Sequence, residues 1–142
     1  MDKAISDNAA SGSATLTVGQ VERELSQKLQ ALYRKYLGHR PSKVTCQLFG
    51  TRLAIVLENS ITQPEQLLAE DGQVELAEKV REDLNTAMRP QIQSLVSEVL
   101  GVEVLDLLSD ATLSTGRTGI IVVLSDAPTV RNPEAIPKLK LS

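Results

Sequence analysis

The stretch GHRPSKVTCQLFGTRLAIVLENSITQPEQLL, residues 38–68, contains a helix end, a hairpin and a helix start. Gly38 is typical of the left-handed cap that ends a helix. Apolar and polar residues alternate on both sides of Gly50–Thr51, a pair that suits a type II′ turn. The segment therefore predicts an antiparallel hairpin of two strands, residues 43–48 and 52–57, between two helices.

A helix is predicted before this segment. Thr17 and Gln20 stand at the spacing of a capping box, in which each side chain bonds to the other residue's backbone N–H. Apolar side chains then recur at helical spacing up to Gly38, at Val21, Leu25, Leu29, Leu32 and Tyr36. These residues define the face that we expect the helix to bury.

Two further helical segments are predicted after the hairpin. Thr62 and Glu65 form a second capping box, and the short helix that they start is expected to stop near Gly72. A helical stripe of apolar residues then continues to Gly101 with Pro90 inside it. Because proline removes a backbone hydrogen bond, we expect either a kink there or two helices in near-continuation.

The pattern returns to strand after Gly101. Residues 102–108 break simple alternation near Asp106, which indicates a bulge or a strand buried on both sides. Residues 114–117 are of types that favour a turn. Residues 119–124 are the run of the chain with the highest preference for a strand. We therefore expect a second hairpin.

The order α-β-β-α-(α)-β-β predicts a two-layer α+β domain. We expect an antiparallel or mixed four-stranded sheet, made of the two hairpins, with two major helices on one face. Residues 16–126 would form this domain. Residues 1–15 are predicted to be a flexible arm, and residues 127–142, which contain three prolines, a mobile tail.

The last predicted strand is apolar at every position from Ile120 through Ile121, Val122 and Val123 to Leu124. Such a strand presents apolar side chains on both faces of the sheet, whereas one helical layer covers only one face. Large bare apolar patches are rare on soluble monomers. These five residues are therefore candidates for an interface in a homodimer or higher oligomer.

Composition excludes several classes of function. The net charge of −3 and the aromatic content of 2% give no support for nucleic-acid binding. The single cysteine, Cys46, fits a reducing compartment, and its place in the strand pattern indicates a small core residue. No signal peptide and no membrane-spanning run is evident, so we expect a cytoplasmic protein without direct membrane insertion.

No catalytic constellation, cofactor motif or metal-ligand spacing is present, so we expect a protein that is not an enzyme and holds neither cofactor nor metal. Six polar residues remain as candidates for contact with a ligand or partner. They occupy the loop before the first hairpin, the long helix and the second hairpin, at His39, Arg40, Arg81, Arg89, Asp110 and Arg117. Each also has an ordinary structural interpretation, as a solvated, capping or turn residue.

Taken together, the pattern resembles the MpsC-like family, small bacterial proteins named after a component of a sodium-translocating, membrane-potential-generating system. The similarity spans residues 18–126. It is carried by the loop with Gly38 and Pro41, the TxxE helix start, the Arg89–Pro90 segment, Gly101–Val104, and the run from Ser109–Asp110 to Thr115–Gly116. Arg40 departs from the second glycine usual in the family, and proline stands at position 64 rather than directly after Thr62.

The resemblance implies a soluble, oligomeric accessory or regulatory protein, because the family carries no established enzymatic activity. Our first functional hypothesis is therefore a homo-oligomeric interaction module that serves a protein partner in ion or bicarbonate transport. The alternative is a sensor that binds a small anion or metabolite near the Gly38–Pro41 loop, Arg81 and Arg89.

Overall fold

A computed structural model of the chain describes residues 16–139. Its elements follow the predicted order of one helix, two strands, two helices and two strands. They are α2 (Val18–Leu37), β1 (Lys43–Phe49), β2 (Arg52–Glu58), α3 (Gln63–Glu70), α4 (Val74–Leu100), β3 (Val104–Thr112) and β4 (Arg117–Leu124), followed by a short 3-10 turn at Pro133–Ala135. The predicted α+β class is confirmed.

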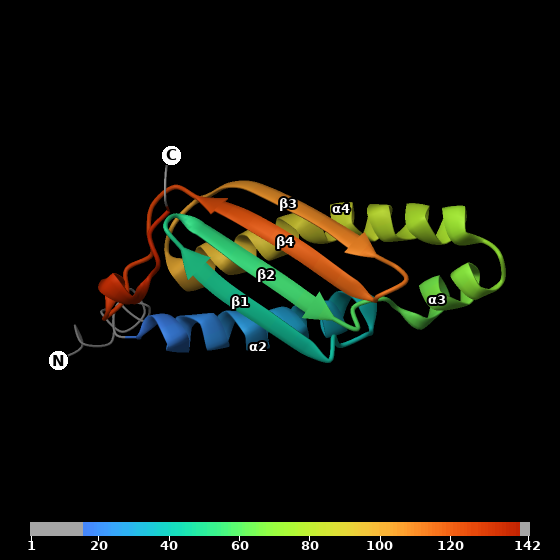
Figure 1. The fold of residues 1–142 in the computed structure, drawn as a ribbon, viewed down its shortest axis with the longest axis horizontal. Helices are drawn as coiled ribbons and strands as arrows, with labels where there is room; N and C mark the ends of the chain where they lie inside the picture. The colour runs from blue at the N-terminus through green and yellow to red at the C-terminus, as the bar shows by residue number, and fades with distance from the viewer. Residues whose placement is uncertain (1–15, 140–142) are drawn as a thin grey trace.

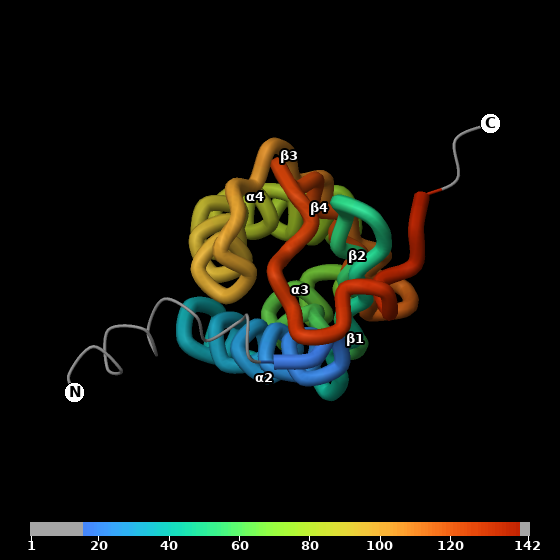
Figure 2. The backbone as a smooth tube through the Cα atoms, turned by 90° about the vertical axis from the view of Figure 1, so that its left-hand side faces the viewer, coloured from blue at the N-terminus to red at the C-terminus, as the bar shows by residue number. Residues whose placement is uncertain are grey.

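The four strands form one sheet in the order β1-β2-β4-β3, and every neighbouring pair is antiparallel. This order brings the second strand of each hairpin to the centre of the sheet and excludes the mixed alternative. Figure 1 looks onto the sheet with α2 and α4 behind it, and Figure 2 shows both helices on the same side. One face of the sheet therefore packs on helices, while the described residues leave the other face open.

The core lies between the sheet and the two long helices. Alternate residues of β1, β2 and β4 are buried against the helices, as the period of a strand requires. Helix α2 buries Tyr33, whereas Tyr36 is 48% exposed and lies under the Lys35 ammonium at 5.4 Å. The expectation that Tyr36 belongs to the core is wrong, because the buried stripe follows the sequence spacing Leu25, Leu29, Tyr33.

The helix ends follow from local sequence. Thr17 and Gln20 form the predicted capping box of α2, and Gly38 ends that helix with a positive φ of 69°. Thr62 and Glu65 form the second box, at the start of α3. Pro90 lies inside α4, which runs as a single helix from residue 74 to residue 100, so the two-helix alternative is excluded.

Both edges of the sheet are protected by acidic side chains. The β3 edge has a bulge between Val104 and Asp106, and Asp106 and Asp110 each accept a hydrogen bond from the next backbone N–H, at 2.8 and 2.9 Å. On the other edge, Glu22 of α2 accepts from the backbone N–H of Leu48 at 2.8 Å. Edge groups bonded in this way are poor templates for a further strand.

Residues 127–139 differ from the mobile tail that we expected. Val130 and Ile136 are buried in the same core as the helices, both at 7% exposure. Asn132 accepts from the Val18 backbone N–H at 2.9 Å, and Pro137 accepts from that of Gly50 at 2.7 Å. The three prolines suggested mobility, but the apolar residues between them pack into the core between the sheet and the helices. The arm expected at residues 1–15 lies outside the described residues.

Replacement of Ile136 by alanine tests this packing. Removing a buried isoleucine side chain leaves a cavity and costs about 2–5 kcal/mol. We expect Ile136→Ala to lower the free energy of unfolding in urea by at least about 2 kcal/mol. The exposed neighbour Lys138, replaced by alanine, serves as the control. Equal stability of both variants and the wild type would mean that this segment is mobile in solution.

Candidate functional site

A buried ion pair joins α3 to α4. The Arg81 guanidinium donates to both carboxylate oxygens of Glu65, with Nε at 2.7 Å and Nη2 at 2.6 Å. The side chains are 4% and 0% exposed. Arg81 also donates to the Ser60 carbonyl oxygen at 3.0 Å and to Asn85 Oδ1 at 3.3 Å. Four of its five N–H groups are thus committed inside the fold.

The Glu65 carboxylate has several donors. Besides Arg81, it accepts from the Thr62 backbone N–H at 3.0 Å and from the Thr62 hydroxyl at 2.7 Å. Burial alone would raise the pKa of Glu65, but hydrogen bonds from Arg81 and Thr62 outweigh it and hold the pKa below its ordinary value. Glu65 therefore remains charged and complements Arg81.

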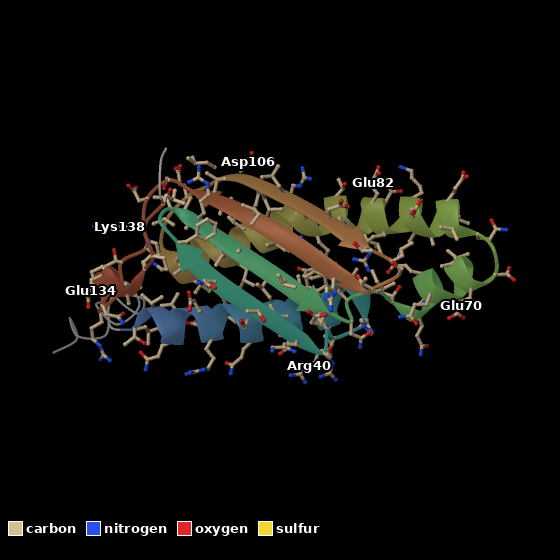
Figure 3. All side chains as sticks on the ribbon, in the orientation of Figure 1. Arg40, Glu70, Glu82, Asp106, Glu134 and Lys138 are labelled. Carbon is tan, nitrogen blue, oxygen red and sulfur yellow. The ribbon has the colours of Figure 1, made fainter. Side chains whose placement is uncertain are left out.

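A groove lies between α4 and the β3–β4 turn and has a volume of about 530 Å³. We call it the helix–hairpin groove. It brings together three of the predicted candidates, because Arg81, Arg89 and Asp110 all line it. Glu78 and Glu82 line it as well, and Figure 3 labels Glu82 on α4. Since Glu65 neutralises Arg81, the two carboxylates that α4 contributes to the groove outnumber its remaining cation, Arg89, and this balance disfavours an anion.

A second groove, the α2 groove, runs beside the end of α2 and has a volume of about 520 Å³. Three cations line it, Arg34, Lys35 and Arg40, together with two glutamines and Ala31. Among residues 16–139, no carboxylate lines this groove. Gln30 positions Arg40 by accepting from its Nη2 at 3.3 Å while donating to the Pro41 carbonyl oxygen at 2.9 Å. Figure 3 shows Arg40 at the outer edge of the molecule. The α2 groove is thus suited to an anion by its charge.

The two other polar candidates make local contacts. His39 donates from Nε2 to the carbonyl oxygen of Asn59 at 2.7 Å, which ties the loop after α2 to the end of β2. Arg117 donates to Glu58 at 2.8 Å in an exposed ion pair. Neither lines the helix–hairpin groove or the α2 groove.

The predicted interface strand divides between the two faces of the sheet. Ile120, Val122 and Leu124 are buried against the helices, so they are core residues. Ile121 and Val123 point to the open face, where Ile121 is 36% exposed. Only these two of the five interface candidates are placed to contact another molecule.

The sequence did not single out Glu65, Ser60 or Asn85 as partners of Arg81. The sequence predicted Glu65 as a member of the capping box that starts a helix. That role does not reveal that the same carboxylate also binds Arg81. Ser60 also bonds to Thr118 of β4 through its hydroxyl at 2.7 Å. These contacts join segments 16 to 58 residues apart, which residue spacing along one helix or strand does not reveal.

The described residues contain no group of three or more His, Cys, Asp or Glu side chains placed to hold a metal ion. Cys46 is buried, and burial raises its pKa to about 11, which keeps the thiol protonated at neutral pH. Of residues 16–139, no helix combines the length and the apolar character needed to cross a membrane.

Replacement of Glu65 by glutamine tests the buried pair. It leaves Arg81 without its counter-charge, and breaking such a pair costs about 3–5 kcal/mol. Because the pKa of Glu65 is lowered in the folded state, its contribution is complete above the ordinary value of 4.5 and is lost as the pH falls through the folded-state pKa. We expect the urea concentration at the unfolding midpoint of the wild type to decrease as the pH is lowered below 4.5. The midpoint of Glu65→Gln should decrease less steeply over the same pH range.

Glu70→Gln, at an exposed position of the same helix, is the matched control and should keep the wild-type pH profile. A Glu65→Gln variant with wild-type stability at pH 7 would contradict the buried pair.

Comparison with known proteins identifies the family. No curated protein and no solved structure matches the chain. Residues 17–126 match the family model described as Na+-translocating membrane potential-generating system (MpsC), which covers the helices and strands of the α+β domain. The chain therefore belongs to the MpsC family.

Proposed function

We propose that the chain is a non-enzymatic, cytoplasmic accessory subunit of a membrane ion-translocating system and works as a homo-oligomer through the open face of its sheet. The family description supports the link to a system that translocates Na+ and generates a membrane potential. The interaction role rests on the structure of the sheet.

The observation that carries this proposal is the exposed apolar centre of the open face. Val56 is 40% exposed, Leu108 55% and Ile121 36%, and they belong to three adjacent strands. Exposed apolar side chains gathered on one surface mark sites of protein interaction. The polar residues around them, among them Glu58 and Arg117, form the kind of rim that surrounds such sites.

The proposal is tested in the organism that carries the chain, by deleting its gene and measuring the Na+-dependent membrane potential with a potential-sensitive dye. We expect the potential to fall and to be restored by the wild type but not by Ile121→Lys, which puts a charge at the centre of the open face. Leu67→Lys is the matched control, because Leu67 is 65% exposed on α3, away from the sheet. A deletion strain with an unchanged potential would contradict the proposal.

A second candidate function is anion sensing in the α2 groove. Three cations line that groove, the part of the chain that the structure describes adds no carboxylate to it, and Gln30 accepts a hydrogen bond from Arg40. Like charges gathered in this way repel one another, and a bound anion would relieve the repulsion. We therefore propose the Gly38–Pro41 side of the predicted sensor as the anion site, rather than Arg81 and Arg89.

Thermal unfolding with added bicarbonate, inorganic phosphate or nucleotide tests this second function. A ligand present at 100 times its Kd stabilises the folded state by about 2.7 kcal/mol, which raises the unfolding temperature by several degrees. We expect the rise to disappear in Arg40→Ala and to persist in Arg89→Ala, the matched control in the other groove. An unfolding temperature that no anion changes would exclude the sensor.

A further inference from the structure

The open face of the sheet is a grid, because the strand registers align its outward residues in four rows. The two central rows pair Val56 with Gly119 and Ala54 with Ile121 across β2 and β4. We call these four residues the central square. Large side chains occupy one diagonal of the square, and glycine and alanine occupy the other. The square therefore alternates between protrusions and depressions.

A second copy of the chain placed face to face with the first is related to it by a two-fold axis in the plane between the sheets. This rotation reverses the grid either across the strands or along them. Either reversal sets each large residue of the central square onto a small residue of the other copy. The square is thus complementary in shape to itself, as an isologous interface requires.

Both axes pair opposite charges. An axis parallel to the strands stacks β2 of one copy on β4 of the other, so two Glu58–Arg117 pairs form between the copies, while Arg52 faces Val123. An axis perpendicular to the strands stacks β2 on β2, so two Glu58–Arg52 pairs form, while Arg117 faces Val123. The charges of the open face therefore complement those of a second copy about either axis.

The acidic residues of β3 behave alike about both axes, because each axis sets one of them on a hydroxyl and the other on an apolar side chain. With the parallel axis, Asp110 faces Thr45 and Asp106 faces Phe49. With the perpendicular axis, Asp106 faces Thr112 and Asp110 faces Leu108. Aligned packing of two sheets, with the strand directions within about 30° of each other, is a common arrangement.

We propose that two copies of the chain dimerise face to face about a two-fold axis in the plane between the sheets, so that Val56 and Ile121 of each copy lie on the glycine and the alanine of the other copy's central square. This inference rests on the proposed homo-oligomer and specifies its geometry. Strands about 4.8 Å apart with seven residues of about 3.4 Å each give a footprint of roughly 450 Å² per copy. Two such footprints fall among the smaller specific interfaces, so the dimer should dissociate at micromolar concentration.

Gly119 offers a clean test, because a Cβ atom added there meets no heavy atom within 4 Å in the single chain. Gly119→Val is therefore expected to leave the fold intact, but it sets a valine against a large side chain of the second copy, either Val56 or Ile121. We expect sedimentation equilibrium of the wild type to show a monomer–dimer equilibrium. Gly119→Val should weaken the dimer at least tenfold with no fall in unfolding temperature. Gly19→Val is the matched control, since a Cβ on Gly19 also meets nothing within 4 Å and lies on α2.

A mixture of two variants identifies the axis. Val56→Ala leaves a gap over the small residue that it faces and should also weaken self-association. About the parallel axis, a mixed dimer of Gly119→Val with Val56→Ala has one native pair and one valine on alanine, so it should form at least tenfold more tightly than either variant alone. About the perpendicular axis, the added valine still faces Ile121, and no such recovery is expected.

The outcomes separate the two proposals. A wild type that remains monomeric at several hundred micromolar overturns both the homo-oligomer and its geometry. A wild-type dimer that Gly119→Val does not weaken overturns this geometry alone. A dimer that Gly119→Val weakens, with an unchanged Gly19→Val control, supports the face-to-face arrangement.

Discussion

The contact between Arg81 and Glu65 holds together parts of the fold that the sheet alone does not connect. One carboxylate caps the first turn of α3, and the same carboxylate binds the guanidinium of α4. Arg81 also reaches the Ser60 carbonyl oxygen at the end of β2, and Ser60 bonds onward to Thr118 of β4. The position of α4 against the central strands thus depends on a buried charge pair whose donors and acceptors are well matched. Removing either partner would leave the other charge buried and unpaired.

The Arg81–Glu65 ion pair also affects which grooves have cations available to bind an anion. Arg81 would have been a natural anion ligand, but its N–H groups are used inside the fold. The helix–hairpin groove is consequently left with an excess of carboxylates, and the free cations gather in the α2 groove instead. With both long helices drawn to one side, the second face of the sheet stays uncovered by the described residues.

Much of the local structure could be predicted from the sequence. Gly50–Thr51 fixes the first hairpin, and the capping residues fix the starts of α2 and α3, because these signals act over a few residues. The strand order could not be predicted, since the pairing of β2 with β4 joins residues more than sixty positions apart. Tyr33 rather than Tyr36 faces the core, because the choice between two positions one turn apart depends on what the helix packs against. The tail was misjudged because its prolines were given more weight than Val130 and Ile136.

Of the candidate site, the sequence indicated the apolar strand but not the shape of its outer face. Ile121 and Val123 point outward only because of the register, and Gly119 has meaning only beside Val56 on the next strand. Isotope-filtered NMR on a mixture of labelled and unlabelled chains tests the resulting account most directly. A face-to-face dimer predicts intermolecular contacts from the Val56 methyl protons of one copy to the Gly119 Hα protons or the Ala54 methyl protons of the other. Intermolecular contacts confined to another surface, such as α3 around Leu67, or their absence at millimolar concentration, would contradict it.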